Sequence, residues 1–392
     1  MFSPRASVPA RRAAGAARAL LETNVAAAQQ PLRPLRLSQP RQQQRHYAMR
    51  GPSLLRRRSR PVEPDGLLFK HSDIPPVDLW RQFKSHRGLG GLTPETCLSA
   101  VMQYCDLATQ TSGLWKEALE RDYNIDLYTL HYAALPLLSR GHGEPAGKLG
   151  MHMLYTASGL GYTSSTLTLM GIIAHSPKES RARTGPVFQA VESRFKRILQ
   201  TEKNPDAFTL QGLTLLSDGQ PDSYALRFFD KAVEAARSIP QPSTADQPGP
   251  SKQATPAARN PRWSYEGPCH QNRGLLLLKQ NRTDEAAASF RIVAHELGLA
   301  GGYAELAKLL PRDAPERETY LLRAAQGGNF DACRLLALDL ADRAADPALP
   351  RAERVHARDM AYEWARLEPD AGKREEVEAR VSERTREVNS RG

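Results

Sequence analysis

Residues 324–336 read AAQGGNFDACRLL, and this stretch decides the fold. Small or apolar residues recur in it at every fourth position, in the order Ala324, Gly328, Ala332 and Leu336. Glycine allows a helix to end in a left-handed turn, and small side chains allow two helices to cross closely. The spacing therefore predicts two helices joined by a tight turn at Gly328, with the alanine and leucine positions facing a neighbouring unit.

The same frame occurs twice more along the chain. Residues 294–306 read AHELGLAGGYAEL, and residues 157–169 read ASGLGYTSSTLTL. Residues 225–232 have the apolar i, i+3, i+4, i+7 spacing that we expect of the first helix of such a pair. Recurrence of one helical unit is the signature of a repeat protein. The positions expected to define the frame are Ala157, Gly161, Leu169, Ala294, Gly298, Leu306, Ala324, Gly328, Ala332 and Leu336.

This frame resembles the Sel1-like branch of the tetratricopeptide superfamily, whose units carry Ala-Ala-x-x-Gly-x-x-x-Ala-x-x-x-Leu-Gly after an amphipathic helix. The copies depart from it: Leu336 is followed by Ala337 in place of glycine, and His295 and Ser158 replace the second alanine in the other copies. The resemblance implies an all-α fold, an α-solenoid of Sel1/TPR-like helical hairpins over about residues 145–345, and work as a protein–protein adaptor. A non-repeat bundle of alanine-rich helix pairs is the alternative.

The charge of the chain is concentrated at one end. The formal net charge is +11, and residues 1–64 carry all of it. Residues 65–392 contain 41 basic and 41 acidic side chains. Bulk charge in the body of the chain therefore gives no argument for binding nucleic acid.

The first 47 residues have the composition of a mitochondrial transit peptide, with eight arginines, no lysine and a single acid, Glu22. The sequence Arg45-His46-Tyr47-Ala48 resembles the pattern at which the matrix protease cuts. We expect cleavage after Tyr47, a mature chain that begins at Ala48, and a location in the matrix or on the matrix face of the inner membrane. The alternative is the disordered basic tail of a cytosolic or nuclear protein.

The composition divides the rest of the chain. Thr93-Pro94-Glu95 is a strong helix start, with a capping hydroxyl and a proline at the first helical position. The stretch from Pro240 to Arg262 is rich in Pro, Ser, Gln and Ala without apolar periodicity, which predicts a disordered insertion that splits one hairpin. The predicted segments are a transit peptide (1–47), a basic, proline-rich linker (48–92), an N-terminal helical cap (93–140), repeats (141–239), the disordered insertion (240–262), further repeats (263–345) and C-terminal capping helices (346–392).

No motif of catalytic or metal chemistry occurs in the sequence. Phosphate loops, nucleophile elbows, dinucleotide fingerprints and C-x-x-C pairs are missing, and the four cysteines are best interpreted as reduced, mostly buried thiols. We therefore expect no enzyme, no catalytic residue, no cofactor and no metal. Leu149 to Pro177 contains no charged residue and is long enough to span a membrane, but its hydroxyls and an expected helix break at Gly161 favour buried repeat helices. Membrane association is expected to be peripheral at most.

These features predict a non-catalytic mitochondrial scaffold that binds proteins, as an assembly or maturation factor for a mitochondrial complex. A resident subunit of such a complex fits the sequence equally well. The alternative is an RNA-binding translational activator or ribosome-associated factor, suggested by the Arg56 to Arg60 cluster, although the neutral body has only 7% aromatic residues. The residues expected to line the groove, on first helices of hairpins, are Arg227, Phe228, Lys231, Arg291, His295, Tyr320 and Arg323.

Overall fold

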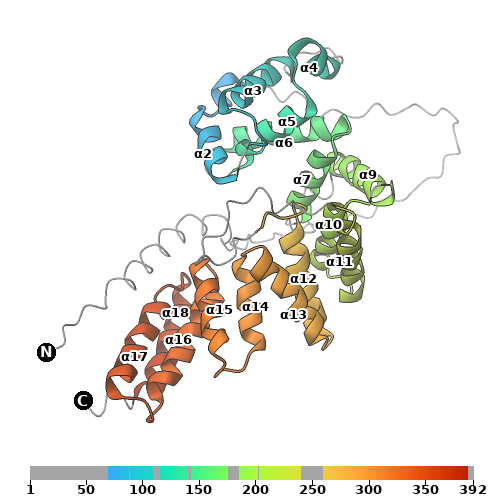
Figure 1. The fold of residues 1–392 in the computed structure, drawn as a ribbon. Coiled ribbons are helices and arrows are strands. Elements are labelled where there is room, and N and C mark those ends of the chain that lie inside the picture. Colours follow the sequence, from blue (N-terminus) through green and yellow to red (C-terminus); the bar gives the residue numbers. More distant parts are fainter. Residues whose placement is uncertain are drawn as a thin grey trace, which may run out of the picture. The chain divides into compact units, whose positions relative to one another are not determined.

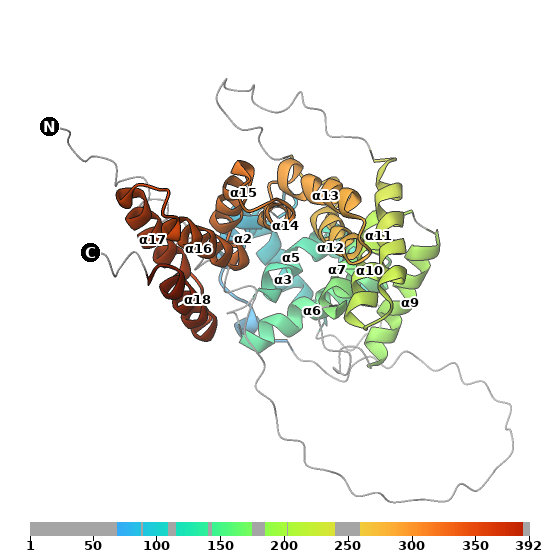
Figure 2. The same ribbon diagram turned by 90° about the horizontal axis from the view of Figure 1, so that it is seen from below.

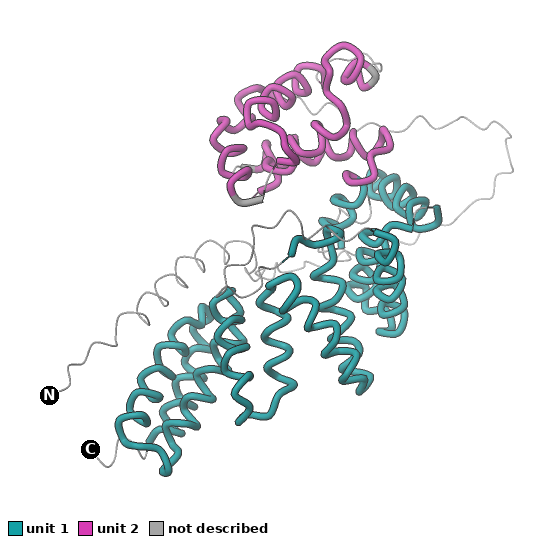
Figure 3. The backbone as a smooth tube through the Cα atoms, viewed as in Figure 1, with its two compact units in different colours: residues 1–26, 166–392 teal, residues 27–165 magenta. Residues whose placement is uncertain are grey.

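The structure is a computed structural model that describes residues 69–87, 89–108, 115–139, 143–174, 185–201, 203–239 and 259–386. Every regular element in these ranges is a helix, which confirms the predicted all-α class. The predicted transit peptide, its cleavage site at Arg45, Tyr47 and Ala48, and most of the predicted insertion lie outside the described residues. Two compact units are present, with a boundary between Ser165 and Thr166 (Figure 3).

The described residues before that boundary form one helical unit around a buried tryptophan. Its elements are η1 (His71–Asp73), α2 (Asp78–Arg87), α3 (Pro94–Ala108), α4 (Trp115–Tyr123), α5 (Leu127–Ala134), η2 (Pro136–Leu138) and α6 (Gly143–Gly159). Trp80 is fully buried, and its Nε1 donates a hydrogen bond to the carbonyl of Ala133 at 3.1 Å. Sequence analysis placed residues 78–87 in a linker, whereas the structure has α2 there because burial of Trp80 holds this short polar helix against α3.

The described residues after the boundary form a row of antiparallel helix pairs. The elements are α7 (Thr163–Ala174), which begins before the boundary, α9 (Pro186–Thr201), α10 (Pro205–Ser217), α11 (Asp222–Ala236), α12 (Glu266–Lys279), α13 (Thr283–Arg291), the π-helical turn η4 (Ile292–Glu296), α14 (Ala300–Leu309), α15 (Pro315–Gln326), α16 (Phe330–Ala345), α17 (Arg351–Ala365) and α18 (Ala371–Arg384). Helices α10 and α11, α12 and α13, α14 and α15, and α16 and α17 pack as hairpins. Each hairpin packs on the next in chain order (Figures 1 and 2).

The glycines of the sequence frame lie in turns between helices, as predicted, but the turn at Gly328 joins α15 to α16 and so links two successive hairpins, whereas the sequence predicted this turn within one hairpin. Gly161, Gly298 and Gly328 have φ values of 100°, 66° and 84°, in the left-handed region that favours glycine. After α15, the Asn329 amide donates to the Ala324 carbonyl at 3.0 Å and the Gly328 amide to that of Ala325 at 3.0 Å. These two bonds satisfy carbonyls that the helix leaves unpaired at its C-terminal end.

The alanine and leucine positions of the frame are buried. Ala157, Ala294, Ala324 and Ala332 have no exposed surface, and Leu169, Leu306 and Leu336 are at most 6% exposed. The copy at residues 294–306 differs in its winding, because the π-helical turn η4 includes its first three residues. The bond from the Leu299 amide therefore reaches the Val293 carbonyl, one residue further back than the equivalent bond in the copy at 324–336. The copies are therefore alike in burial and differ in the winding of the preceding helix.

The predicted pairing of helices around the insertion is wrong. Helix α11 was expected to be the first helix of a hairpin that the insertion splits, but it packs as the second helix of a hairpin with α10. A turn at Gly219, with φ of 67°, joins the two helices, and Gly212 of α10 lies directly against the Phe229 ring of α11. The insertion therefore connects two complete hairpins.

The last residues of the predicted insertion are ordered by ion pairs. Arg259 donates two hydrogen bonds of 2.9 Å to the carboxylate of Glu266, which has no exposed surface, and Arg262 donates to the same group from its backbone and side chain. Burial alone would raise the pKa of Glu266, but the hydrogen bonds from the two arginines outweigh it and lower this pKa. Arg259 and Arg262 thus belong to the ordered helical unit.

The uncharged stretch from Leu149 onward is divided between α6 and α7, with the turn at Gly161 between them, as the sequence predicted. Within the described part of the chain, none of the helices has the length and apolar character needed to cross a bilayer.

Candidate functional site

Two hollows along helix α16 form a candidate binding groove. Their volumes are about 440 and 740 Å³, and they share four lining residues, Glu318, Leu336, Leu340 and Arg343. Because these residues line both hollows, the two spaces are parts of one groove beside α15 and α16. The loop before α15 closes the first half, and α17 closes the second half.

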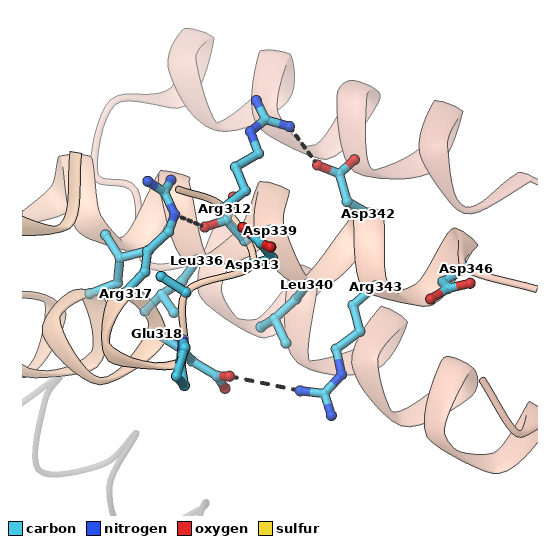
Figure 4. A pocket seen from close by; sticks show the side chains of 13 residues that line it. Arg312, Asp313, Arg317, Glu318, Leu336, Asp339, Leu340, Asp342, Arg343 and Asp346 are labelled. Carbon is cyan, nitrogen blue, oxygen red and sulfur yellow. Dashed lines mark hydrogen bonds and ion pairs between the residues drawn. The ribbon is translucent and has the colours of Figure 1, made fainter. Parts of the chain in front are cut away.

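The first half of the groove is charged, and Figure 4 shows how its arginines are held. Arg317 is 7% exposed and donates to Asp339 at 2.8 Å and to the Ala307 carbonyl at 2.8 Å. Arg312 reaches Asp342 at 2.9 Å, in a more exposed pair. Arginine held by two acceptors loses little further freedom on binding a ligand, so this wall is preorganised.

The second half has an apolar floor and a charged rim. The floor residues are Leu322, Leu336, Leu340, Ala357, Met360 and Trp364, from α15, α16 and α17. Glu353 and His356 are exposed on the α17 rim, and Glu318 and Arg343 lie 3.7 Å apart at the junction with the first half. An apolar floor with a few polar groups around it is the usual composition of a recognition site.

A second cluster joins η4, α14 and α15. Tyr303 and Tyr320 have ring centroids 5.9 Å apart, and the His295 ring lies 5.6 and 5.5 Å from them. The guanidinium of Arg323 lies 5.4 Å from the centre of the Tyr303 ring and donates to its hydroxyl at 3.2 Å. Burial, then Arg323 and Arg291, lowers the pKa of His295. We call these four residues together with Arg291 the cationic aromatic cluster.

The groove residues expected from the sequence fall into two groups. His295, Tyr320 and Arg323 come together in the cationic aromatic cluster, and Arg291 lies one helical turn before His295. Arg227, Phe228 and Lys231 lie on α11, where the Lys231 ammonium is 5.2 Å from the centre of the Phe228 ring. Apart from His295, which lies in η4, they lie on second helices of hairpins. Their expected placement on first helices is therefore wrong, for the same reason as the expected pairing of α11.

Sequence reasoning missed the groove along α16 and one member of the cluster. Tyr303 was hidden inside the frame copy at 294–306, at a position that the frame does not use. Trp364 and Met360 belong to a segment that was interpreted only as a cap. Their spacing of four on one helix is a recognisable signal of a shared face.

The four cysteines are buried and unpaired, as predicted. Burial raises the pKa of Cys97 and Cys105 to about 11 and that of Cys269 and Cys333 to about 12, so all four are thiols at neutral pH. Among the described residues, no three His, Cys, Asp or Glu side chains are placed to hold a metal ion. No protein-family model, no curated protein and no solved structure matches this chain.

Proposed function

We propose that this protein is a non-catalytic scaffold of mitochondria, a Sel1/TPR-like solenoid that binds a protein partner during the assembly or maturation of a mitochondrial complex. The observation that carries the proposal is the groove along α16, with an apolar floor next to a preorganised charged wall. Such a surface offers affinity through its floor and specificity through its wall.

The row of hairpins supports the solenoid interpretation. Each helix pair buries its alanine-rich faces against the next pair, and the frame glycines make the turns between pairs. In solenoids, each unit contacts only its neighbours, which leaves long lateral surfaces free for partners. The arginine-rich first 47 residues supply the mitochondrial part of the proposal.

Affinity capture of the tagged protein from mitochondria tests this function. Ala352 is exposed and lines the apolar half of the groove, so Ala352→Arg fills the groove without removing a core side chain. Ala379→Arg, on the exposed face of α18, is the matched control. We expect one stoichiometric protein to copurify with the wild type and the control and to be lost from Ala352→Arg, while all three melt alike by circular dichroism.

Capture of no stoichiometric protein by the wild type contradicts the proposed function. Recovery of crosslinked RNA in its place would support the translational activator instead. Equal capture by Ala352→Arg would retain the scaffold but exclude the groove along α16 as its binding surface.

A further inference from the structure

Two arginines of the cationic aromatic cluster have no carboxylate partner. Arg291 and Arg323 make no ion pair with any of the residues that the structure describes, whereas two acids on neighbouring elements, Glu296 and Glu305, are paired with other cations. Glu296, next to His295, accepts from Arg259 at 2.7 Å, and Glu305 of α14 accepts from Lys308 at 2.8 Å. Arg323 and Arg291 both lower the pKa of His295, as expected of two positive charges close to the ring.

Side chains from three elements, η4, α14 and α15, meet in the cationic aromatic cluster. Arg323 is already oriented by the Tyr303 hydroxyl and ring, and Tyr303 itself is only 8% exposed. The Tyr320 hydroxyl lies 3.4 Å from Nε2 of the exposed His295. A partly buried guanidinium held in place by an aromatic ring binds a carboxylate with little loss of side-chain entropy.

We propose that the cationic aromatic cluster binds a carboxylate-bearing segment of a protein partner, with Arg323 and Arg291 as its charged donors and the Tyr320 hydroxyl as a neutral one. This inference rests on the proposed function and names the chemistry of one part of the partner. Arg323 is the central donor because the Tyr303 ring and hydroxyl already orient it. Exposed Arg291, one helical turn before His295, adds a second positive charge.

An acidic peptide fits this surface better than RNA. Single-stranded nucleic acid is held by aromatic faces that are open for stacking. Here the Tyr303 ring is buried, with Arg323 on it, and the Tyr320 ring packs against both His295 and Tyr303. Among the described residues Arg323 donates only to the Tyr303 hydroxyl, so it keeps further N–H groups for a ligand, whereas the ring faces are largely occupied.

Binding of short labelled probes to the purified protein tests the inference. The probes are a fluorescein-labelled peptide of alternating glutamate and glycine, the same peptide with glutamine for glutamate, and a labelled oligouridine, each followed by fluorescence anisotropy. We expect salt-sensitive binding of the glutamate peptide alone, weakened about ten-fold by Arg323→Gln and less by Arg291→Gln. Tyr320→Phe keeps the ring and should weaken binding by a smaller factor.

Controls separate this inference from the proposed function. Arg366→Gln removes an exposed arginine elsewhere and should bind the glutamate peptide like the wild type. Arg291 is exposed and contacts no described acid, so Arg291→Gln remains informative even if Arg323→Gln fails to fold. Equal binding of the glutamate and glutamine peptides, unchanged binding by the Arg291 and Arg323 variants, or preferential binding of oligouridine would overturn the inference. The proposed function has a separate test: if the wild type still captures its protein partner from mitochondria, the scaffold function stands even when the cationic aromatic cluster does not bind the glutamate peptide.

Discussion

At the scale of single residues, backbone conformation decides the turn at Gly328. A Cβ atom added there meets nothing within 4 Å, but φ is +84°, which β-branched side chains avoid. We expect Gly328→Val to destabilise the C-terminal hairpins by about 1 to 3 kcal/mol. Asn281 adopts a φ of 59° in the turn between α12 and α13, which shows that asparagine accepts a left-handed turn in this fold. Gly328→Asn is therefore the matched control and should cost less than about 1 kcal/mol. Urea unfolding that ranks the two variants equally would contradict this account.

Two buried histidines make stability depend on pH. Burial lowers the pKa of His131 and of His270 from 6.5 to about 4. Because the unfolded chain then binds protons more readily than the folded one, stability is full above pH 6.5 and falls as the pH drops from 6.5 towards 4. Each histidine should contribute a loss of about 2 kcal/mol between pH 7 and pH 5.

Unfolding followed at several pH values checks this prediction. His270 is 2% exposed, and neither ring nitrogen has a hydrogen-bond partner among the described residues. His270→Leu removes this unpaired polar group, so the free energy of unfolding should fall less between pH 7 and pH 5 than in the wild type. A wild-type stability that stays constant from neutral pH to about pH 5 would show that these rings are accessible to protons in the folded state.

At the scale of elements, a glycine of the first helix faces a phenylalanine of the second helix in two hairpins. A Cβ added to Gly274 would lie 2.4 Å from Phe290, and one added to Gly212 would lie 2.7 Å from Phe229. Alanine is favoured over glycine inside a helix by about 1 kcal/mol, whereas overpacking a buried ring costs about 1 to 3 kcal/mol. Packing therefore outweighs propensity, and Gly274→Ala should destabilise the protein.

Thermal melts of two alanine variants check that balance. Gly372 of α18 has only an ordinary contact in the direction of its Cβ, at 3.5 Å, so Gly372→Ala should be neutral or stabilising by less than about 1 kcal/mol. Stabilisation by Gly274→Ala would mean that α12 and α13 do not cross where the structure places them.

The insertion between α11 and α12 should be dispensable up to Arg259. Loop-closure entropy changes slowly with length, so deleting residues 241–257 should change stability by less than about 1 kcal/mol. Arg259→Ala should cost about 2 kcal/mol, because it leaves the buried carboxylate of Glu266 with Arg262 alone. Arg237→Ala, which removes an exposed pair with Glu234, is the control and should cost less than about 1 kcal/mol. Loss of helicity on deletion of residues 241–257 would contradict the expectation that the fold needs only the end of the insertion, from Arg259 onward.

The turns were the part of the fold that the sequence predicted best. A positive φ restricts the choice of residue so strongly that Gly161, Gly298 and Gly328 are visible in the sequence alone. The pairing of helices could not be predicted from the frame, because α10 and α11 are joined by a turn at Gly219 that lies outside it. Each of two hairpins has a glycine on its first helix that faces a phenylalanine on its second helix, Gly212 with Phe229 and Gly274 with Phe290. This shared pattern could have predicted the pairing.

At the scale of the whole molecule, the sequence predicts an all-α chain but not its division into units. Frame residues 157–169 suggested continuous repeats, yet the boundary falls after Ser165, inside that copy. Local spacing reports the winding of a helix and the turn at its end, whereas a unit boundary depends on which buried faces meet. The groove along α16 was hidden for a similar reason, since it forms only where the three successive helices α15, α16 and α17 pack together.

Photocrosslinking in isolated mitochondria tests the central claim, that the protein acts by binding a protein partner, most directly. Benzoylphenylalanine placed at Ala352 reports what enters the groove along α16, and the same group at Ala379 of α18 reports what meets an exposed helix face outside it. The account predicts crosslinking to a single protein species from position 352 and none from position 379. Crosslinks to RNA, or the same scattered products from both positions, would contradict it.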